Sequence, residues 1–292
     1  MLTAALTALA MLAFALNSLL CRAALAGGHA DAASFTTLRL ASGAVVLALV
    51  ARSRGGVGPS SRAAWGSAAA LFAYALLFSL AYLRISAGTG ALLLFAAVQL
   101  TMIGASLVAG SRPSLAEWTG LALSLAGLVL LTLPGLARPD PLGALAMLLA
   151  GAAWGAYSLR GRGAGDPVVT NAASFARAVV PALVASVLFL LAHGVRLTPE
   201  GALLAFASGA FTSGLGYAVW YAALRGLAAT SAAVVQLSVP PLAAGLGALA
   251  LGESVSLRLL GASVLILGGI ALAVTAHGGP RRDIARNARA AQ

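Results

Sequence analysis

Charged residues are scarce in this sequence, and lysine is missing altogether. Only 9% of the 292 residues are charged, whereas a soluble domain contains about 25%. All 18 positively charged side chains are arginines. The chain therefore lacks the lysine of a P-loop and any lysine for Schiff-base chemistry. These absences exclude a soluble enzyme and ATP hydrolysis by this chain.

Residues that bind metals or perform acid–base catalysis are also few. The single cysteine, Cys21, lies in an apolar stretch, so an intramolecular disulfide is excluded. The three histidines lie at the ends of apolar stretches or in loops, without a carboxylate or cysteine at ligand spacing. The carboxylates are scattered in or beside loops: Asp31, Glu117, Asp140, Asp166, Glu200, Glu253 and Asp283. We therefore expect no metal, no cofactor and no catalytic residue, which argues against a lipid-modifying membrane enzyme.

Long apolar runs are what the sequence has in excess. Hydrophobic residues make up 61% of the chain, and a membrane-spanning helix needs about 20 apolar residues, which leaves room for about ten spans. Charged and Gly/Pro-rich breaks place the spans at 3–26, 34–51, 64–83, 89–110, 115–135, 142–159, 170–192, 200–223, 228–250 and 256–276. The predicted fold class is an all-α integral membrane protein with ten transmembrane helices.

The distribution of arginine predicts the orientation of these helices. Arginine near the ends of spans is retained on the cytoplasmic side. With the N-terminus inside, the cytoplasmic side holds Arg52, Arg54, Arg62, Arg112, Arg160, Arg162, Arg225, Arg281, Arg282, Arg286 and Arg289. The shorter list on the outside is Arg22, Arg39, Arg84, Arg138, Arg196 and Arg258. The bias favours both termini in the cytoplasm. The net charge of +11 thus reflects loop arginines rather than a nucleic-acid-binding face.

The chain also resembles itself at a spacing of about 140 residues. The run 31–35, Asp-Ala-Ala-Ser-Phe, returns as Asn-Ala-Ala-Ser-Phe at 171–175, and Val-Gln-Leu at 98–100 returns at 235–237. Several matches in order predict a duplication, with repeats over 1–136 and 137–278 and a basic tail over 279–292. Because each repeat has five spans, the second must be inverted. Such repeats bind substrate near the midplane and provide alternating access.

Polar and aromatic residues deep in the spans are the candidate substrate-binding residues, since an apolar residue there usually contacts lipid. Asn17 lies in the middle of the first span. Gln99 and Gln236 are equivalent in the two repeats, and each lies near the midplane of its helix. Aromatic residues recur at helical spacing in the third, sixth and eighth spans. The full set is Asn17, Phe78, Tyr82, Phe95, Gln99, Trp154, Tyr157, Tyr217, Tyr221 and Gln236.

Each candidate has an alternative role. Asn17 and the two glutamines are equally suited to interhelical hydrogen bonds, and tyrosine and tryptophan populate the membrane interface. Trp154 stands between Gly151 and Gly155, which fits either a close helix crossing or a bulky wall opposite a cavity. We expect the first, third, fourth, sixth, eighth and ninth spans to surround the cavity, with the fifth and tenth at the periphery.

Three motifs stand at corresponding places before later spans: Tyr82–Gly88 before the fourth, Trp220–Arg225 before the ninth and Leu251–Ser254 before the tenth. In these motifs the chain resembles the EamA-type members of the drug/metabolite transporter superfamily. Within that superfamily, the run Gly88–Phe95 followed by Val98 and Gln99 is similar to the YddG-like exporters of aromatic and other amino acids.

This resemblance implies a multi-pass carrier in the bacterial inner membrane that exports small neutral solutes, in particular amino acids, with the lipid bilayer as its surroundings. An exporter of other metabolites or drugs remains an alternative. Phosphorylated substrates are less favoured, because hardly any arginine lies deep in the spans to pair with phosphate. Neither a P-loop nor a titratable group at membrane depth is present, so we expect facilitated transport along the substrate gradient. The oligomeric state stays open.

Overall fold

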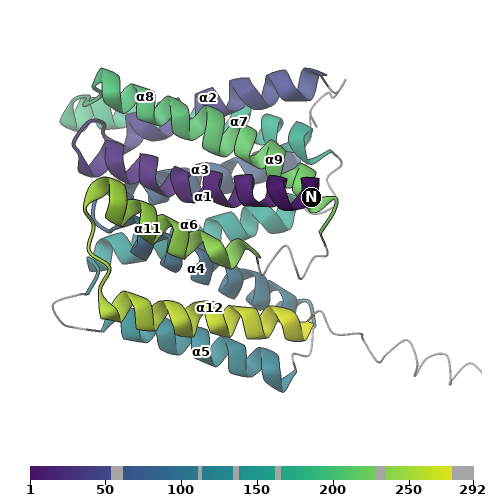
Figure 1. The fold of residues 1–292 in the computed structure, drawn as a ribbon. Coiled ribbons are helices and arrows are strands. Elements are labelled where there is room, and N and C mark those ends of the chain that lie inside the picture. The colour runs from purple at the N-terminus through teal and green to yellow at the C-terminus, as the bar shows by residue number, and fades with distance from the viewer. Residues whose placement is uncertain (54–61, 111–113, 134–137, 162–165, 228–234, 278–292) are drawn as a thin grey trace, which may run out of the picture.

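The computed structural model describes residues 1–53, 62–110, 114–133, 138–161, 166–227 and 235–277 as a helical bundle (Figure 1). Within these ranges, nine helices are long and apolar enough to cross a membrane, and the helix over Gln236–Leu251 is apolar but shorter. The one strand-like feature described is an isolated bridge between Ala30 and Leu197. The all-α integral membrane fold is therefore confirmed. The first part of the expected span 228–250 lies outside the described residues.

The helices begin and end within a few residues of the predicted spans, because capping residues stand where the apolar runs begin. Ser86 caps α4, Ser114 forms a capping box with Glu117 at α5, and Asp166 caps α7. The elements are α1 (Leu2–Ala26), α2 (Ala32–Ser53), α3 (Arg62–Tyr82), α4 (Ala87–Val108), α5 (Leu115–Thr132), α6 (Pro141–Gly161), α7 (Pro167–His193), α8 (Pro199–Ala207), η1 (Ser208–Leu215), α9 (Gly216–Leu224), η2 (Gln236–Ser238), α11 (Val239–Leu251) and α12 (Leu257–His277).

The helices differ in how far they are enclosed. Helices α5 and α12 lie side by side at one edge of the bundle, and α2 and α8 lie at the opposite edge (Figure 1). In the apolar segment of α4, 67% of the residues are buried, against 22% in that of α5. The fifth and tenth spans are thus peripheral, as expected, and α4 is central.

The eighth span contains a π-helix, η1, between α8 and α9. Its Gly209 contacts the backbone oxygen of Arg39 and the side chain of Ser42 so closely that a Cβ atom has no room there. The Ser42 hydroxyl also donates to the backbone oxygen of Phe206, 3.4 Å away. Widened turns of this kind often occur at functional sites. Here the widened turn brings the eighth span against α2.

Small residues join α5 to α12. Gly120, Ser124 and Gly127 form the buried stripe of α5 together with Leu131. A Cβ atom on Gly120 would lie 2.7 Å from the backbone nitrogen of Ala273, and one on Gly269 would lie 2.6 Å from the Ser124 hydroxyl oxygen. Membrane helices depend on such close backbone approach, because apolar side chains gain little by leaving lipid.

We predict that Gly269→Ala destabilises the protein, because the added methyl group has to separate α5 from α12. Overpacking costs about 1–3 kcal/mol. The matched control is Gly268→Ala, since no atom lies within 4 Å of a Cβ atom at Gly268. Thermal unfolding in detergent should show a lower midpoint for Gly269→Ala alone. Equal midpoints for the two variants would contradict the glycine contact.

Candidate functional site

Nine aromatic side chains form one connected group inside the bundle, which we call the aromatic cluster. Its members come from α1, α3, α6, α7 and α9, and thus from both halves of the chain. They are Phe14, Tyr74, Phe78, Tyr82, Trp154, Tyr157, Phe175, Tyr217 and Trp220. Of the predicted site residues, the structure brings together Phe78, Tyr82, Trp154, Tyr157 and Tyr217 here.

Trp154 lies at the centre of the aromatic cluster. Its ring centroid is 4.8 Å from that of Tyr74 and 5.4 Å from those of Tyr157 and Tyr217. The neighbouring glycines face α4: a Cβ atom on Gly151 would lie 2.6 Å from the backbone oxygen of Leu94. Of the two roles considered for this segment, the close helix crossing is confirmed, and the wall of a cavity stays a prediction. The glycines form the crossing with α4, and Trp154 projects towards α3 and α9.

Phe78 and Tyr82 extend the aromatic cluster along α3. Their ring centroids lie 4.7 Å apart in an edge-to-face arrangement, and Phe78 also packs on Tyr74 at 5.3 Å. The Tyr82 hydroxyl donates to the backbone oxygen of Ala87, 3.3 Å away. Both side chains are fully buried, so in this conformation they contact protein rather than open space.

Arg39 lies against the same rings. Its predicted position among the outside arginines is wrong, and so is the expectation that hardly any arginine lies deep in the spans. The structure places it inside α2, with only 1% of the residue exposed. Its carbon Cζ lies 5.0 Å from the ring centroid of Phe78 and 5.3 Å from that of Tyr74. The sequence did contain a sign of this burial, because Arg39 lies five residues inside the expected span 34–51.

Asn17 forms an interhelical hydrogen-bond group with η1. Its Oδ1 accepts hydrogen bonds from the hydroxyls of Ser208 at 2.8 Å and Thr212 at 3.1 Å, and all three residues are buried. Because this oxygen already has two donors, Asn17 has a defined role in joining α1 to the eighth span. Its contact with a substrate stays a prediction.

A second amide connects two of the predicted tyrosines. Asn171 Oδ1 accepts a hydrogen bond from the Tyr157 hydroxyl at 2.5 Å, and its Nδ2 donates to the Tyr221 hydroxyl at 2.9 Å. In the sequence, Asn171 is the repeat counterpart of Asp31. The two side chains have different roles, since Asp31 accepts hydrogen bonds from the backbone nitrogens of Ser34 and Arg196.

The remaining predicted residues lie in or beside the central helices. Phe95 is buried in α4, and Gln99 is half-buried one turn further along. Gln236 lies in the short turn η2 and makes a polar interaction. Among the described contacts, none joins Gln99 to Gln236, so their cooperation at a substrate remains a prediction.

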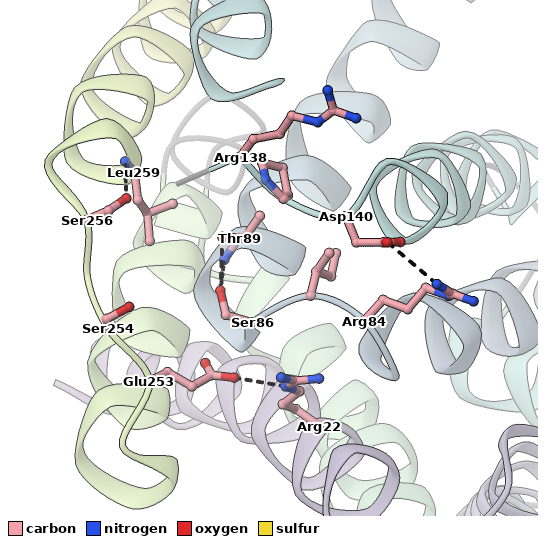
Figure 2. Close-up of a pocket in the computed structure, with 12 residues that line it drawn as sticks. Arg22, Arg84, Ser86, Thr89, Arg138, Asp140, Glu253, Ser254, Ser256 and Leu259 are labelled. Atoms are coloured by element: carbon pink, nitrogen blue, oxygen red, sulfur yellow. Dashed lines mark hydrogen bonds and ion pairs between the residues drawn. The ribbon is translucent and has the colours of Figure 1, made fainter. Parts of the chain in front are cut away.

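At one end of the bundle, short loops are tied together by ion pairs and backbone contacts. We call this the tied end; it comprises residues 27–31, 83–86, 138–140, 194–198 and 252–256. Arg22 Nε lies 2.9 Å from Glu253 Oε1, and Arg84 Nη1 lies 3.5 Å from Asp140 Oδ2 (Figure 2). The backbone nitrogen of Thr198 donates to the oxygen of His29 at 2.8 Å. These contacts connect loops from both halves.

A pocket of about 370 Å³ opens at the tied end. Arg22, Arg84 and Arg138 contribute to its lining together with Asp140 and Glu253 (Figure 2). Glu253 has a second role, because its Oε2 accepts from the backbone nitrogen of Ala87 at the start of α4. Glu253, one of the loop carboxylates of the sequence, therefore joins α1, α4 and the loop before α12.

This helical architecture is similar to that of known proteins. Residues 141–275 match the EamA-like transporter family. The chain is 54% identical over 271 residues to the uncharacterized protein PA1977 of Pseudomonas aeruginosa, covering 92% of this chain and 93% of that protein. The chain belongs to the EamA-like transporter family. A crystal structure that is 24% identical aligns with a TM-score of 0.64 over 92% of this chain and 98% of that one, which shows a shared fold. As an EamA-like protein, the chain is a membrane transporter of small solutes.

For this EamA-like transporter we predict that Glu253→Ala lowers the unfolding midpoint. The change leaves Arg22 unpaired and removes the acceptor for Ala87, and a hydrogen bond to a charged group contributes about 2 kcal/mol. The control is Glu200→Ala at the same end, because the Glu200 side chain is 64% exposed and pairs with His29 at 3.3 Å. Exposed pairs contribute under about 1 kcal/mol. Thermal unfolding in detergent measures both, and similar losses would show that the Glu253 contacts are unimportant.

Proposed function

We propose that the protein exports small neutral solutes, in particular amino acids including aromatic ones, by alternating access. The observation that carries this proposal is the aromatic cluster, which lies inside the bundle and draws its side chains from both halves of the chain. Aromatic side chains can stack on the rings of a substrate and thereby select substrates by shape. Membership in the EamA-like family supports transport, and the likeness to YddG-like exporters rests on sequence motifs alone.

The packing of the helices supports the two inverted repeats. Helix α3 packs against α6, and the eighth span packs against α1. Likewise α4 packs against α6, and α11 packs against α1. The pairs α2–α7 and α5–α12 join equivalent spans. Each of these contacts thus has a counterpart when the spans are renumbered by five, and the family match covers 141–275, within the range of the proposed second repeat.

The tied end would be the outer side of the membrane. Removing Arg39 from the outside arginines leaves Arg22, Arg84, Arg138, Arg196 and Arg258 there, which strengthens the bias towards cytoplasmic termini. In that orientation, which we propose for the bacterial inner membrane, the ion pairs of the tied end close the external side. Outward opening would have to break them.

The direct test is a transport assay with purified protein in liposomes, run over the twenty amino acids and several unrelated metabolites. We expect counterflow of amino acids, with aromatic ones among the substrates. Replacing Gln99 and Gln236 together by alanine should abolish it while the protein still folds. Transport confined to unrelated metabolites would refute the amino-acid proposal, and formation of a covalent product from lipid would indicate an enzyme instead.

We predict that Trp154→Ala alters the relative rates for large and small amino acids, because this ring lies at the centre of the aromatic cluster. An aromatic contact contributes about 0.5–1.5 kcal/mol, or about a two- to thirteen-fold change in a rate ratio. Trp65→Ala is the control, since Trp65 is 52% exposed on α3. Uptake rates of tryptophan and alanine provide the ratio. An equal loss for both substrates, together with poor expression, would assign Trp154 to packing alone.

We further predict that transport is facilitated and reversible. The described carboxylates, from Asp31 to Glu253, lie at helix ends or in loops, whereas proton-coupled carriers usually place an acid or histidine at membrane depth. Arg39 cannot act as the proton switch, because a guanidinium remains charged. Liposomes with equal substrate on both sides and an imposed pH gradient should therefore show no accumulation. Accumulation of a zwitterionic substrate would reveal a titrating group and contradict facilitated transport.

A further inference from the structure

Arg39 carries a positive charge that no carboxylate among the described residues balances. The ion pairs Arg22–Glu253, Arg84–Asp140 and His29–Glu200 all lie at the tied end. Arg39 is fully buried in α2 and takes part in no ion pair with a described residue. A charge within a membrane-spanning segment is costly and usually has a partner or lines a substrate pathway. The missing partner therefore needs an explanation.

The contacts of Arg39 occupy only part of its hydrogen-bonding capacity. Nη2 donates to the Tyr74 hydroxyl at 3.1 Å, and Nε donates to the Ser213 hydroxyl at 3.3 Å. The rings of Tyr74 and Phe78 lie against the guanidinium and stabilise its charge by cation–π contact. Nη1 is buried without a hydrogen-bond partner, the one such side-chain atom in the part of the chain that the structure describes.

We propose that Arg39 binds a carboxylate of the transported solute, so that the carrier selects solutes that bear this group. A carboxylate matches the planar fork of a guanidinium with two parallel hydrogen bonds. It would supply both the acceptor that Nη1 lacks and the missing negative charge. The inference rests on the proposed function, since it names the group by which the amino-acid substrates are held.

The rings around Arg39 are those that the rest of such a solute would contact once they move. The Tyr74 ring lies between the guanidinium, at 5.3 Å, and Trp154, at 4.8 Å. Movement of this one ring therefore connects Arg39 to the centre of the aromatic cluster. A carboxylate at Arg39 would place an attached aromatic side chain against Trp154 and Tyr217, which form the next ring contact.

The single guanidinium also limits the charge of the ligand. Phosphate carries more negative charge than one arginine balances, and the chain has no lysine to add to it. The described neighbours of Arg39 are hydroxyls and rings, which balance no second charge. An amine without a carboxylate would place a second positive charge beside the first. The site therefore fits one carboxylate better than either alternative.

A binding experiment tests this inference without requiring transport. Purified full-length protein in detergent is titrated at constant ionic strength with phenylalanine, 3-phenylpropionate or phenylalaninamide, and the unfolding midpoint is measured. The first two carry a carboxylate and should raise the midpoint, whereas phenylalaninamide should not. An equal effect of phenylalaninamide, or no effect of either carboxylate, overturns the proposal. This comparison uses the unaltered protein, so it does not depend on the folding of a variant.

Variants then assign the effect to Arg39. We expect Arg39→Gln to abolish the response to 3-phenylpropionate and Arg39→Lys to weaken its apparent affinity at least tenfold, because an ammonium lacks the planar fork. The matched control is Arg177→Gln, which removes an arginine of α7 outside the aromatic cluster and should leave the response unchanged. A full response in a folded Arg39→Lys or Arg39→Gln protein overturns the assignment.

Counterflow in liposomes separates this inference from the proposed function. Phenylalanine should exchange, and phenylalaninamide should exchange at least tenfold more slowly. If carboxylates bind through Arg39 but no amino acid is transported, the proposed function fails and the carboxylate site stands. If both compounds are transported at similar rates, the transporter stands and the carboxylate site fails.

Discussion

A bilayer offers no water to a buried polar group, and this constraint decides where the polar side chains of this protein lie. Ion pairs gather at the tied end, beyond the apolar parts of the helices. Inside the bundle, Asn17 and Asn171 are held by hydroxyl groups of neighbouring spans. Arg39 alone among the described side chains keeps a buried nitrogen without a partner. Among the described residues, the buried polar side chains thus have hydrogen-bond partners, and the exception is Nη1 of Arg39, whose guanidinium faces aromatic rings.

Glycine determines which helix faces meet and hence where the aromatic rings lie. At Gly151 the backbone of α6 contacts α4, which turns Trp154 towards α3 and α9. At Gly209 the π-helix contacts α2 beside Arg39, which brings Ser213 within reach of the guanidinium. Larger residues at these crossings would separate the helices and open the packing of the aromatic cluster. The small residues therefore position the candidate site although they do not belong to it.

Most of the fold was predictable from the sequence, because apolar length and capping residues define membrane helices locally. The bounds of α2 and α7 follow from runs that end at charged or glycine-rich breaks. Helical spacing also predicts that Trp154 and Tyr157 share one face of α6. The partners of Asn17 and Asn171 could not be predicted, since they depend on which face of one helix meets another. Arg39 was misplaced because counting arginines by loop treats every one of them as exposed.

The tied end and the aromatic cluster are joined by a direct contact, which gives the two regions a physical connection. Arg22 Nη1 donates to the backbone oxygen of Tyr82 at 2.8 Å, and the Tyr82 ring packs on Phe78, which lies under the guanidinium of Arg39. Breaking the Arg22–Glu253 pair frees a residue that also holds the end of α3. A solute that moved the rings at Arg39 would act on the same helix, about one turn away. Because packed interfaces switch between discrete arrangements rather than deform continuously, closure of the tied end and occupation of the aromatic cluster would bias the same movement of α3.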